Sequence, residues 1–300
     1  MFDMRTAMTK AMGRAALGGA ALGLLSVFAV TGAQAGEGQP SPWQMTLQPA
    51  ATPIAESIHS FHTMLMWIIS IITVFVLGLL LWIVVRYNER ANPTPSKTSH
   101  NTMIEVVWTV VPVLILVIIA IPSFRLLRDQ VVIPKSDITL KITGKQWYWT
   151  WEYPKDAGGF SFDSIMMSDE DRAKVIAAGA KKEDFPRLLA VDNEAFVPVN
   201  KVIRVQVTAA DVIHAFALQS FGVKIDAMPG RLNETWFKPT REGRFYGQCQ
   251  ELCGKDHAFM PLVINVVSEE KYNAWLAEAK KKFASAPDAG SRIAAVEPAR

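Results

Sequence analysis

Two cysteines, a histidine and a methionine lie within twelve residues near the C-terminal end of the sequence. They are Cys249, Cys253, His257 and Met260. Thiolate, imidazole and thioether together select a soft or borderline transition metal, and they form the ligand set of copper electron-transfer centres. The other three histidines lie beside apolar segments, so His214 is the natural source of a second imidazole. The pattern therefore predicts a copper site.

Each of these residue types also has a simpler use. Two cysteines four positions apart can form a short disulfide in an exported protein. Cysteine and histidine also bind zinc, although zinc sites seldom use methionine. A lone histidine is commonly a hydrogen-bonded core residue. The four types together favour a metal site over these alternatives, and the absence of a C-x-x-C-H motif excludes a covalently attached haem in this chain.

The candidate ligands lie in a region, residues 129–270, that is typical of β structure. Apolar or alternating segments separated by Gly, Pro and Asp predict short strands of a sandwich or barrel. The expected strands are 138–143, 145–153, 202–207, 213–218 and 261–267. The stretch 168–182 has a helical composition within an insertion at about 164–190. A last amphipathic helix is expected at roughly 269–283. Residues 271–300 are assigned to this helix and to the tail that follows it.

Two long apolar segments precede this domain. Residues 64–85 and 106–124 carry no charge over 22 and 19 residues, so each is long enough, at 1.5 Å per residue, to cross a hydrocarbon core of roughly 30 Å. Pro112 and Pro122 lie in the second segment, where membrane helices tolerate proline. The sequence thus predicts a two-helix transmembrane hairpin at 61–128.

The N-terminus has the pattern of a secretory signal peptide. Basic residues, an apolar run and the A-Q-A sequence at 33–35 predict cleavage after residue 35, leaving an exported segment at 36–60. Arg86, Arg90 and Lys97 lie between the two spans and are expected to remain cytoplasmic. Both mature termini and the β domain would then be periplasmic, on a bacterial inner membrane. The 31 basic and 28 acidic residues nearly balance, so nucleic acid is not an expected partner.

The spacing C-x-E-x-C-G-x-x-H-x-x-M-P at 249–261 closely resembles the copper A loop of cytochrome c oxidase subunit II. The resemblance runs from about residue 45 to 270. It includes the two-span hairpin, QWYW at 146–149, DVIH at 211–214 and KIDAMPGR at 224–231.

The resemblance implies a cupredoxin-like Greek-key β-barrel that holds a dinuclear copper A centre. In that family the two cysteines bridge both coppers, each histidine binds one, and methionine and a backbone carbonyl are further ligands. The corresponding residues are Cys249, Cys253, His214, His257, Met260 and the carbonyl of Glu251. The Glu251 carboxylate would help to bind magnesium at the contact with subunit I, in keeping with the oxygen preference of that ion.

Other positions correspond to family residues with transport roles. Trp147 matches the tryptophan through which an electron enters from cytochrome c, although an aromatic side chain here could instead anchor the domain at the membrane interface. Four acidic positions match residues thought to attract cytochrome c: Asp163, Asp192, Asp211 and Asp226. Ala210 stands where relatives often have an acid. Glu105 matches a carboxylate that, in the family, marks the entrance of a proton pathway into subunit I. The alternative is that it is only a charged residue at the end of a helix.

The resemblance implies subunit II of a cytochrome c oxidase. The chain would accept electrons from cytochrome c and pass them to haem in subunit I, where reduction of oxygen to water is coupled to proton pumping. Its partners would be subunit I, other oxidase subunits, cytochrome c and membrane lipid. A metal-free quinol-oxidase subunit is disfavoured by the intact ligand set, and a soluble copper A enzyme by the two spans.

Overall fold

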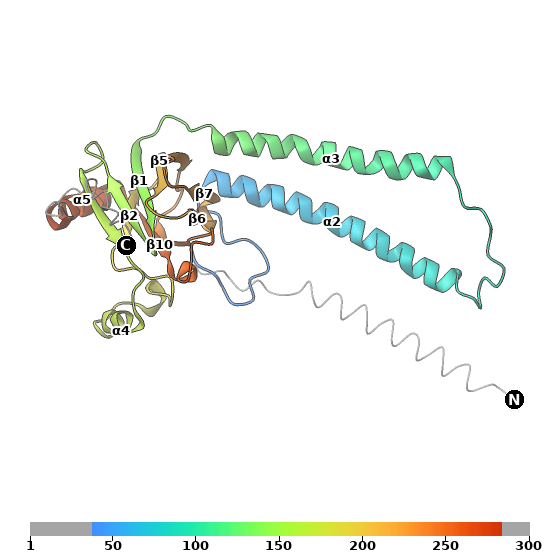
Figure 1. Ribbon diagram of the computed structural model, residues 1–300, viewed down its shortest axis with the longest axis horizontal. Helices are drawn as coiled ribbons and strands as arrows, with labels where there is room; N and C mark the ends of the chain where they lie inside the picture. Colours follow the sequence, from blue (N-terminus) through green and yellow to red (C-terminus); the bar gives the residue numbers. More distant parts are fainter. Residues whose placement is uncertain (1–37, 284–300) are drawn as a thin grey trace, which may run out of the picture.

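The computed structural model describes residues 38–283. Two long helices project from one side of a β domain (Figure 1). The expected signal peptide at 1–35 and the C-terminal tail beyond residue 283 lie outside the described residues. The expected combination of a helical hairpin and a β domain is confirmed.

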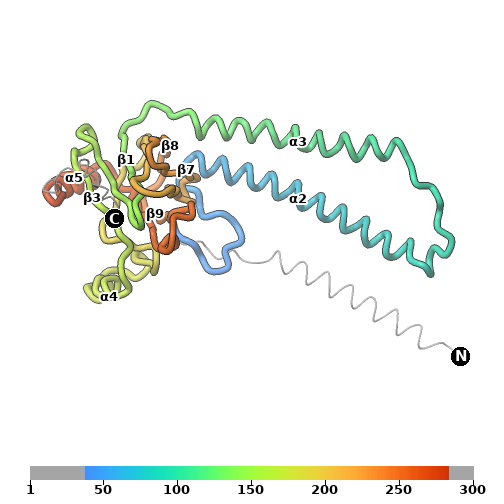
Figure 2. The backbone as a smooth tube through the Cα atoms, viewed as in Figure 1, coloured from blue at the N-terminus to red at the C-terminus, as the bar shows by residue number. Residues whose placement is uncertain are grey.

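The two long helices are α2 (Pro53–Arg86) and α3 (Thr102–Val131). Side-chain oxygens of Thr52 and Asn101 accept hydrogen bonds from backbone N–H groups in their first turns, which defines where the helices begin. The helices run side by side (Figure 2). An 18-residue stretch within each helix has a mean hydropathy of 3.0 in α2 and 2.8 in α3. The apolar side chains of both helices are exposed in the chain by itself, as expected for spans that face lipid or other subunits.

Both helices are longer than the apolar segments from which they were predicted. Helix α2 begins at Pro53, inside the segment 36–60 that was expected to precede the spans. Proline suits the first turn, because its missing N–H would have no partner there. Helix α3 continues through Pro112 and Pro122.

The β domain contains three sheets. Its strands are β1 (Ile138–Lys145), β2 (Tyr148–Tyr153), β3 (Phe160–Ser164), β4 (Ala195–Pro198), β5 (Ile203–Ala209), β6 (His214–Leu218), β7 (Val223–Ala227), β8 (Asn233–Phe237), β9 (Gly243–Gln248) and β10 (Pro261–Val267). The sheet orders are β3-β2-β1-β5-β8, β4-β10-β9 and β6-β7. Strand β5 runs parallel to β1, and β4 runs parallel to β10; the other pairs are antiparallel.

One apolar core joins the three sheets. Strand β5 has the alternating burial of a strand with one covered face, whereas all five residues of β6 are buried. The core's largest fully buried side chains include Trp149, Trp151 and Phe216. The two cysteines and Met260 belong to this same core, so the candidate metal ligands are part of the packed interior.

The insertion and the C-terminal helix cover the edges of the domain. Helix α4 (Asp169–Ala177) and the 3-10 turn η1 (Lys182–Asp184) lie in the insertion. This segment is attached to β9, where the Tyr246 hydroxyl and Arg244 Nη1 each donate to the Asp184 carbonyl at 2.8 Å. Helix α5 (Glu269–Phe283) stacks Trp275 on Phe196 of β4, with ring centroids 4.8 Å apart.

Strand β9 passes unusually close to β6 at Gly247. A Cβ atom at this position would lie 2.0 Å from the backbone oxygen of Ala217. Real Cβ contacts are never this short, so the two strands can approach this closely only with glycine here. The contact keeps β9, which leads into Cys249, beside β6, which begins at His214.

We expect Gly247→Ala to force β6 and β9 apart. The free energy of unfolding should fall by about 3 kcal/mol or more, at or beyond the upper end of the usual cost of overpacking. Denaturant unfolding of the full chain in detergent, followed by tryptophan fluorescence, measures the loss. Gly78→Ala is the control, because no atom lies within 4 Å of the added methyl group. An alanine at 247 that leaves unfolding unchanged would contradict this packing.

Candidate metal centre

The candidate ligands come from the ends of neighbouring strands. His214 is the first residue of β6, and residues 249–260 form the loop between β9 and β10. The backbone N–H of Cys249 donates to the Met260 carbonyl (3.1 Å), which closes this loop at its base. The N–H of Gln250 donates to the carbonyl of Ala215 (3.2 Å), which attaches the loop to β6. These contacts bring His214 to the loop.

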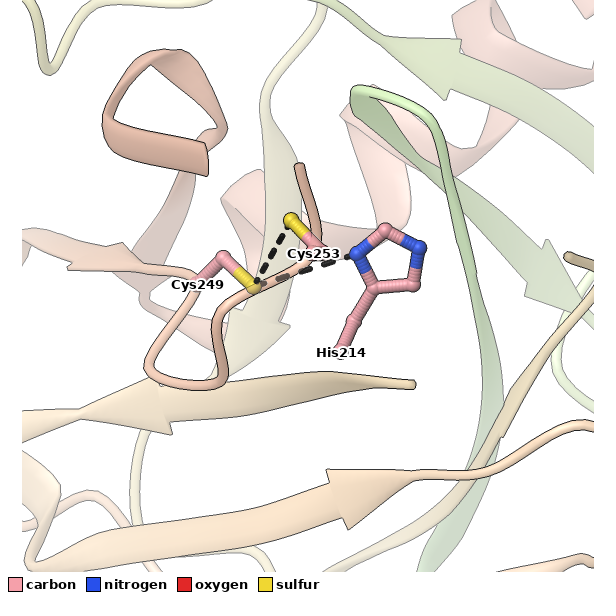
Figure 3. A group of neighbouring side chains, drawn as sticks. All are labelled: His214, Cys249 and Cys253. Atoms are coloured by element: carbon pink, nitrogen blue, oxygen red, sulfur yellow. Dashed lines mark hydrogen bonds between the residues drawn. The ribbon is translucent and has the colours of Figure 1, made fainter. Parts of the chain in front are cut away.

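The two sulfur atoms and the two imidazoles face one another. Cys249 Sγ lies 3.8 Å from Cys253 Sγ and 3.9 Å from His214 Nδ1, as Figure 3 shows. Cys253 Sγ lies 3.5 Å from His257 Nδ1. The sulfur separation is well above the 2.05 Å of a disulfide, and both cysteines are free. Soft sulfur and borderline nitrogen donors thus converge on one buried point.

The remaining two expected ligands also lie at this point. Met260 is 1% exposed and packs in the core that contains both cysteines. The carbonyl oxygen of Glu251 lies 3.3 Å from Cys249 Sγ. The Glu251 side chain is exposed and turned to solvent in this chain. A donor set of two thiols, two imidazoles, a thioether and a carbonyl fits copper, because most of these ligands are soft or borderline.

The two thiols differ in acidity although they are neighbours. Burial opposes ionisation of Cys249, but hydrogen bonds from His214 and from the backbone of Glu251 and Ala215 outweigh it and lower the Cys249 pKa. Burial and the adjacent charge of Cys249 raise the Cys253 pKa. One thiolate is therefore favoured in the metal-free chain, and a cation is needed to hold both sulfurs deprotonated.

Three neighbours restrict the orientation of the His214 ring. Its Nε2 atom lies 2.9 Å from Asp211 Oδ1, while Nδ1 faces Cys249. A Cβ atom on Gly144 would come within 2.9 Å of the ring carbon Cδ2, so glycine is needed at this point of β1. The edge of Trp149 packs against the ring with centroids 6.0 Å apart. The side chain is fully buried.

Trp147 lies directly against the ligand loop. Its indole Nε1 donates a hydrogen bond to the carbonyl of Cys253 (3.1 Å), and Gln146 Nε2 donates to the same oxygen (3.1 Å). The ammonium of Lys255 lies 5.6 Å from the centroid of the indole. The sequence analysis did not identify Gln146 or Gly144 as site residues. Gln146 stands beside Trp147 in the aromatic motif, but its contact with Cys253 depends on the fold.

The four expected docking aspartates fall in different surroundings. Asp163 and Asp192 lie close together, because two hydrogen bonds join the chain segments that contain them. The Asn193 side chain donates to the Asp163 carbonyl, and the Ile165 N–H donates to the Asp192 carboxylate. Asp226 is exposed on β7, the partner strand of β6. Asp211 contacts His214.

Glu105, the expected proton-pathway residue, lies far from the ligands in sequence, in the first turn of α3. Its Oε1 atom lies 2.8 Å from Nδ1 of His100.

Known proteins share both parts of this architecture. The family model for the transmembrane domain of cytochrome c oxidase subunit II matches residues 40–126, and the model for its periplasmic domain matches residues 138–267.

"Probable cytochrome c oxidase subunit 2" of Rickettsia bellii is 49% identical over 257 residues, covering 86% of this chain and 91% of that protein. "Cytochrome c oxidase subunit 2" of Cereibacter sphaeroides is 44% identical over 281 residues, covering 88% and 91%. The crystal structure of the periplasmic domain of subunit II (CoxB) of Bradyrhizobium japonicum is 62% identical, with a TM-score of 0.45, and covers 51% of this chain and 99% of that one.

The matches cover the helical hairpin, the β domain and the ligand loop together. The periplasmic domain of this family is cupredoxin-like and carries the copper A site, with which the buried His–Cys–Cys group is compatible. The chain is therefore a membrane protein with a periplasmic domain, and it belongs to the subunit II family of cytochrome c oxidase, a haem–copper terminal oxidase.

Proposed function

We propose that the chain receives electrons from cytochrome c at a dinuclear copper A centre and passes them to haem in subunit I. There, reduction of oxygen to water is coupled to proton pumping. The observation that carries the proposal is the convergence of the buried Cys249, Cys253 and His214 with the half-buried His257, in which neighbouring sulfur and nitrogen atoms lie 3.5 to 3.9 Å apart. Two copper ions held by these residues would supply a one-electron carrier whose charge is spread over two metals.

In this function the protein holds the ligands in fixed positions and shields them from solvent. Cys249 and Cys253 are 5% and 4% exposed, and His214 is fully buried. The ligands come from a strand end and from a hairpin loop that is closed by backbone hydrogen bonds. A rigid frame of this kind changes little between two charge states, so electron transfer needs little rearrangement.

Trp147 is the proposed point at which the electron enters. Its indole is half-buried, with one hydrogen bond to the backbone of a bridging cysteine. This contact provides a short path of bonds from the ring to Cys253 Sγ. Asp163, Asp192 and Asp226 present carboxylates on the surface of the domain, where they would attract a basic partner over a distance set by salt.

The remaining assignments concern the membrane and the other subunits. We infer that the hairpin spans the bacterial inner membrane with both mature termini on the periplasmic side, contacting lipid, subunit I and other subunits. The solvent-facing Glu251 carboxylate is available to bind magnesium at the contact with subunit I. Glu105, at the N-terminus of α3, is proposed to mark a proton pathway into subunit I.

The full chain loaded with copper should bind two coppers and give the EPR spectrum of one unpaired electron shared between them. Cys249→Ser and Cys253→Ser should each abolish that spectrum, because a hydroxyl is a poor bridge for copper. Metal analysis together with EPR spectroscopy tests this. Binding of one copper, preference for zinc, or a normal dinuclear spectrum in either serine variant would exclude the proposed centre.

Met260→Leu should keep the dinuclear spectrum and change only the reduction potential. The leucine has nearly the same volume, so the core should lose less than about 1.5 kcal/mol of stability. The lost thioether is a weak ligand, whose main effect is on the potential. Redox titration of the copper-loaded chain measures the change. Loss of both coppers in this variant would show that Met260 is essential to binding.

Transfer through Trp147 and attraction by the aspartates can be separated in the assembled oxidase. Trp147→Gln should slow electron transfer within the bound complex roughly tenfold, a barrier increase of about 1.4 kcal/mol, with nearly unchanged affinity. Asp226→Asn and Asp192→Asn should weaken cytochrome c association roughly two- to fivefold at low salt, because each exposed charge contributes below about 1 kcal/mol.

Stopped-flow reduction by cytochrome c at several ionic strengths distinguishes these effects. The aspartate effects should shrink as salt rises, since exposed charges are screened over about 8–10 Å near physiological salt. A Trp147→Gln variant that loses only affinity, or aspartate effects that do not change with salt, would contradict the assignment.

A further inference from the structure

Both carboxylate oxygens of Asp211 are engaged inside the chain. Oδ1 lies 2.9 Å from His214 Nε2 and accepts the backbone N–H of Val212 at 2.7 Å. Oδ2 accepts the backbone N–H of Gln146, also at 2.7 Å. Asp226, by comparison, makes no side-chain hydrogen bond or ion pair to any of the residues that the structure describes. Asp211 is therefore held in place by three partners, although its residue is partly open to solvent.

The contact with Asp211 selects one tautomer of His214. An ionised carboxylate has no hydrogen to donate, so His214 Nε2 must carry the hydrogen of the bond that it makes with Asp211. The unprotonated nitrogen is then Nδ1, the atom that faces Cys249 Sγ at 3.9 Å. A histidine that binds a metal through one ring nitrogen almost always donates the hydrogen on its other nitrogen to an acceptor such as a carboxylate.

Asp211 also joins the histidine to the surface turn that contacts the ligand loop. The backbone of Gln146 is bonded to Asp211, and the side chains of Gln146 and Trp147 both donate to the Cys253 carbonyl. One carboxylate thus connects His214 on β6 to the 146–147 turn, and that turn to the loop with both cysteines. A displacement of Asp211 would therefore disturb His214, the 146–147 turn and the cysteine loop.

We propose that Asp211 is a positioning residue of the metal centre, which orients His214 and fixes the 146–147 turn against the cysteine loop. The proposal rests on the copper function proposed above. It assigns different work to Asp211 and Asp226, which the sequence pattern placed in one group. Loss of such a hydrogen-bonded carboxylate behind a histidine ligand typically weakens metal binding about 10- to 100-fold.

Asp211→Asn in the full chain tests the proposal, because asparagine keeps the shape of aspartate but has a single acceptor oxygen. That oxygen cannot serve Gln146, Val212 and His214 as two carboxylate oxygens do. We expect copper retention against a chelator to fall about 10- to 100-fold and the histidine hyperfine couplings in the EPR spectrum to change.

Asp137→Asn is the matched control. The Asp137 carboxylate accepts one backbone N–H, that of Val202 at 2.7 Å, which the single amide oxygen of asparagine can still accept, so the variant removes a carboxylate charge away from the ligands. It should retain copper normally with an unchanged EPR spectrum. If Asp211→Asn does not accumulate, Asp211→Glu carries the same test: it keeps the negative charge, but the longer side chain shifts the oxygens, so copper retention should still fall.

Three results decide the matter. Normal copper retention and an unchanged EPR spectrum in the Asp211 variant would overturn the positioning role. Weakened, salt-dependent cytochrome c association as its sole defect would identify Asp211 as a docking charge. Failure of the unmodified chain to bind two coppers would instead contradict the proposed function itself, so the two failures are distinguishable.

Discussion

The close approach of β9 to β6 is the contact on which the metal centre depends. Gly247 lets the strands approach until the position of a side-chain methyl group would fall 2.0 Å from the Ala217 oxygen. Three residues after Gly247, the N–H of Gln250 donates a hydrogen bond to the carbonyl of Ala215 in β6. His214 and the cysteine loop are far apart in sequence, and this pair of backbone contacts brings them together. Backbone packing therefore places these ligands beside one another.

Burial decides what this cluster can do. Two thiols a few ångströms apart in the core cannot both ionise easily, because the site offers little solvation and the charges repel. A bound cation removes that conflict and holds both sulfurs as thiolates. The hydrogen bonds that keep the ligands in place arise from Asp211, from Gln146 and from the backbone of the loop. The packing thus favours a bound cation, and the sulfur and imidazole donors favour a soft or borderline metal.

The sequence by itself determined the architecture wherever local pattern and composition decide structure. Length and lack of charge predicted both spans, and helix α5 has the bounds expected for the last helix, 269–283. Strand β10 likewise spans 261–267, as its apolar run predicted. Strands β3, β4, β7, β8 and β9 were not predicted. They are short or largely polar, as in the NETWF sequence of β8, so their partners rather than their own pattern make them strands.

The ligand types and their spacing within 249–260 were also readable from the sequence, because a loop brings such residues together by chain length alone. Only the tertiary structure decided the rest of the site. It placed His214 against Cys249, put Trp147 on the Cys253 carbonyl and separated Asp211 from the other aspartates. The contacts of His214 with Cys249 and of Trp147 with Cys253 join residues 35 and 106 positions apart. Their geometry depends on how strands pack across the barrel, which no local pattern of residues encodes.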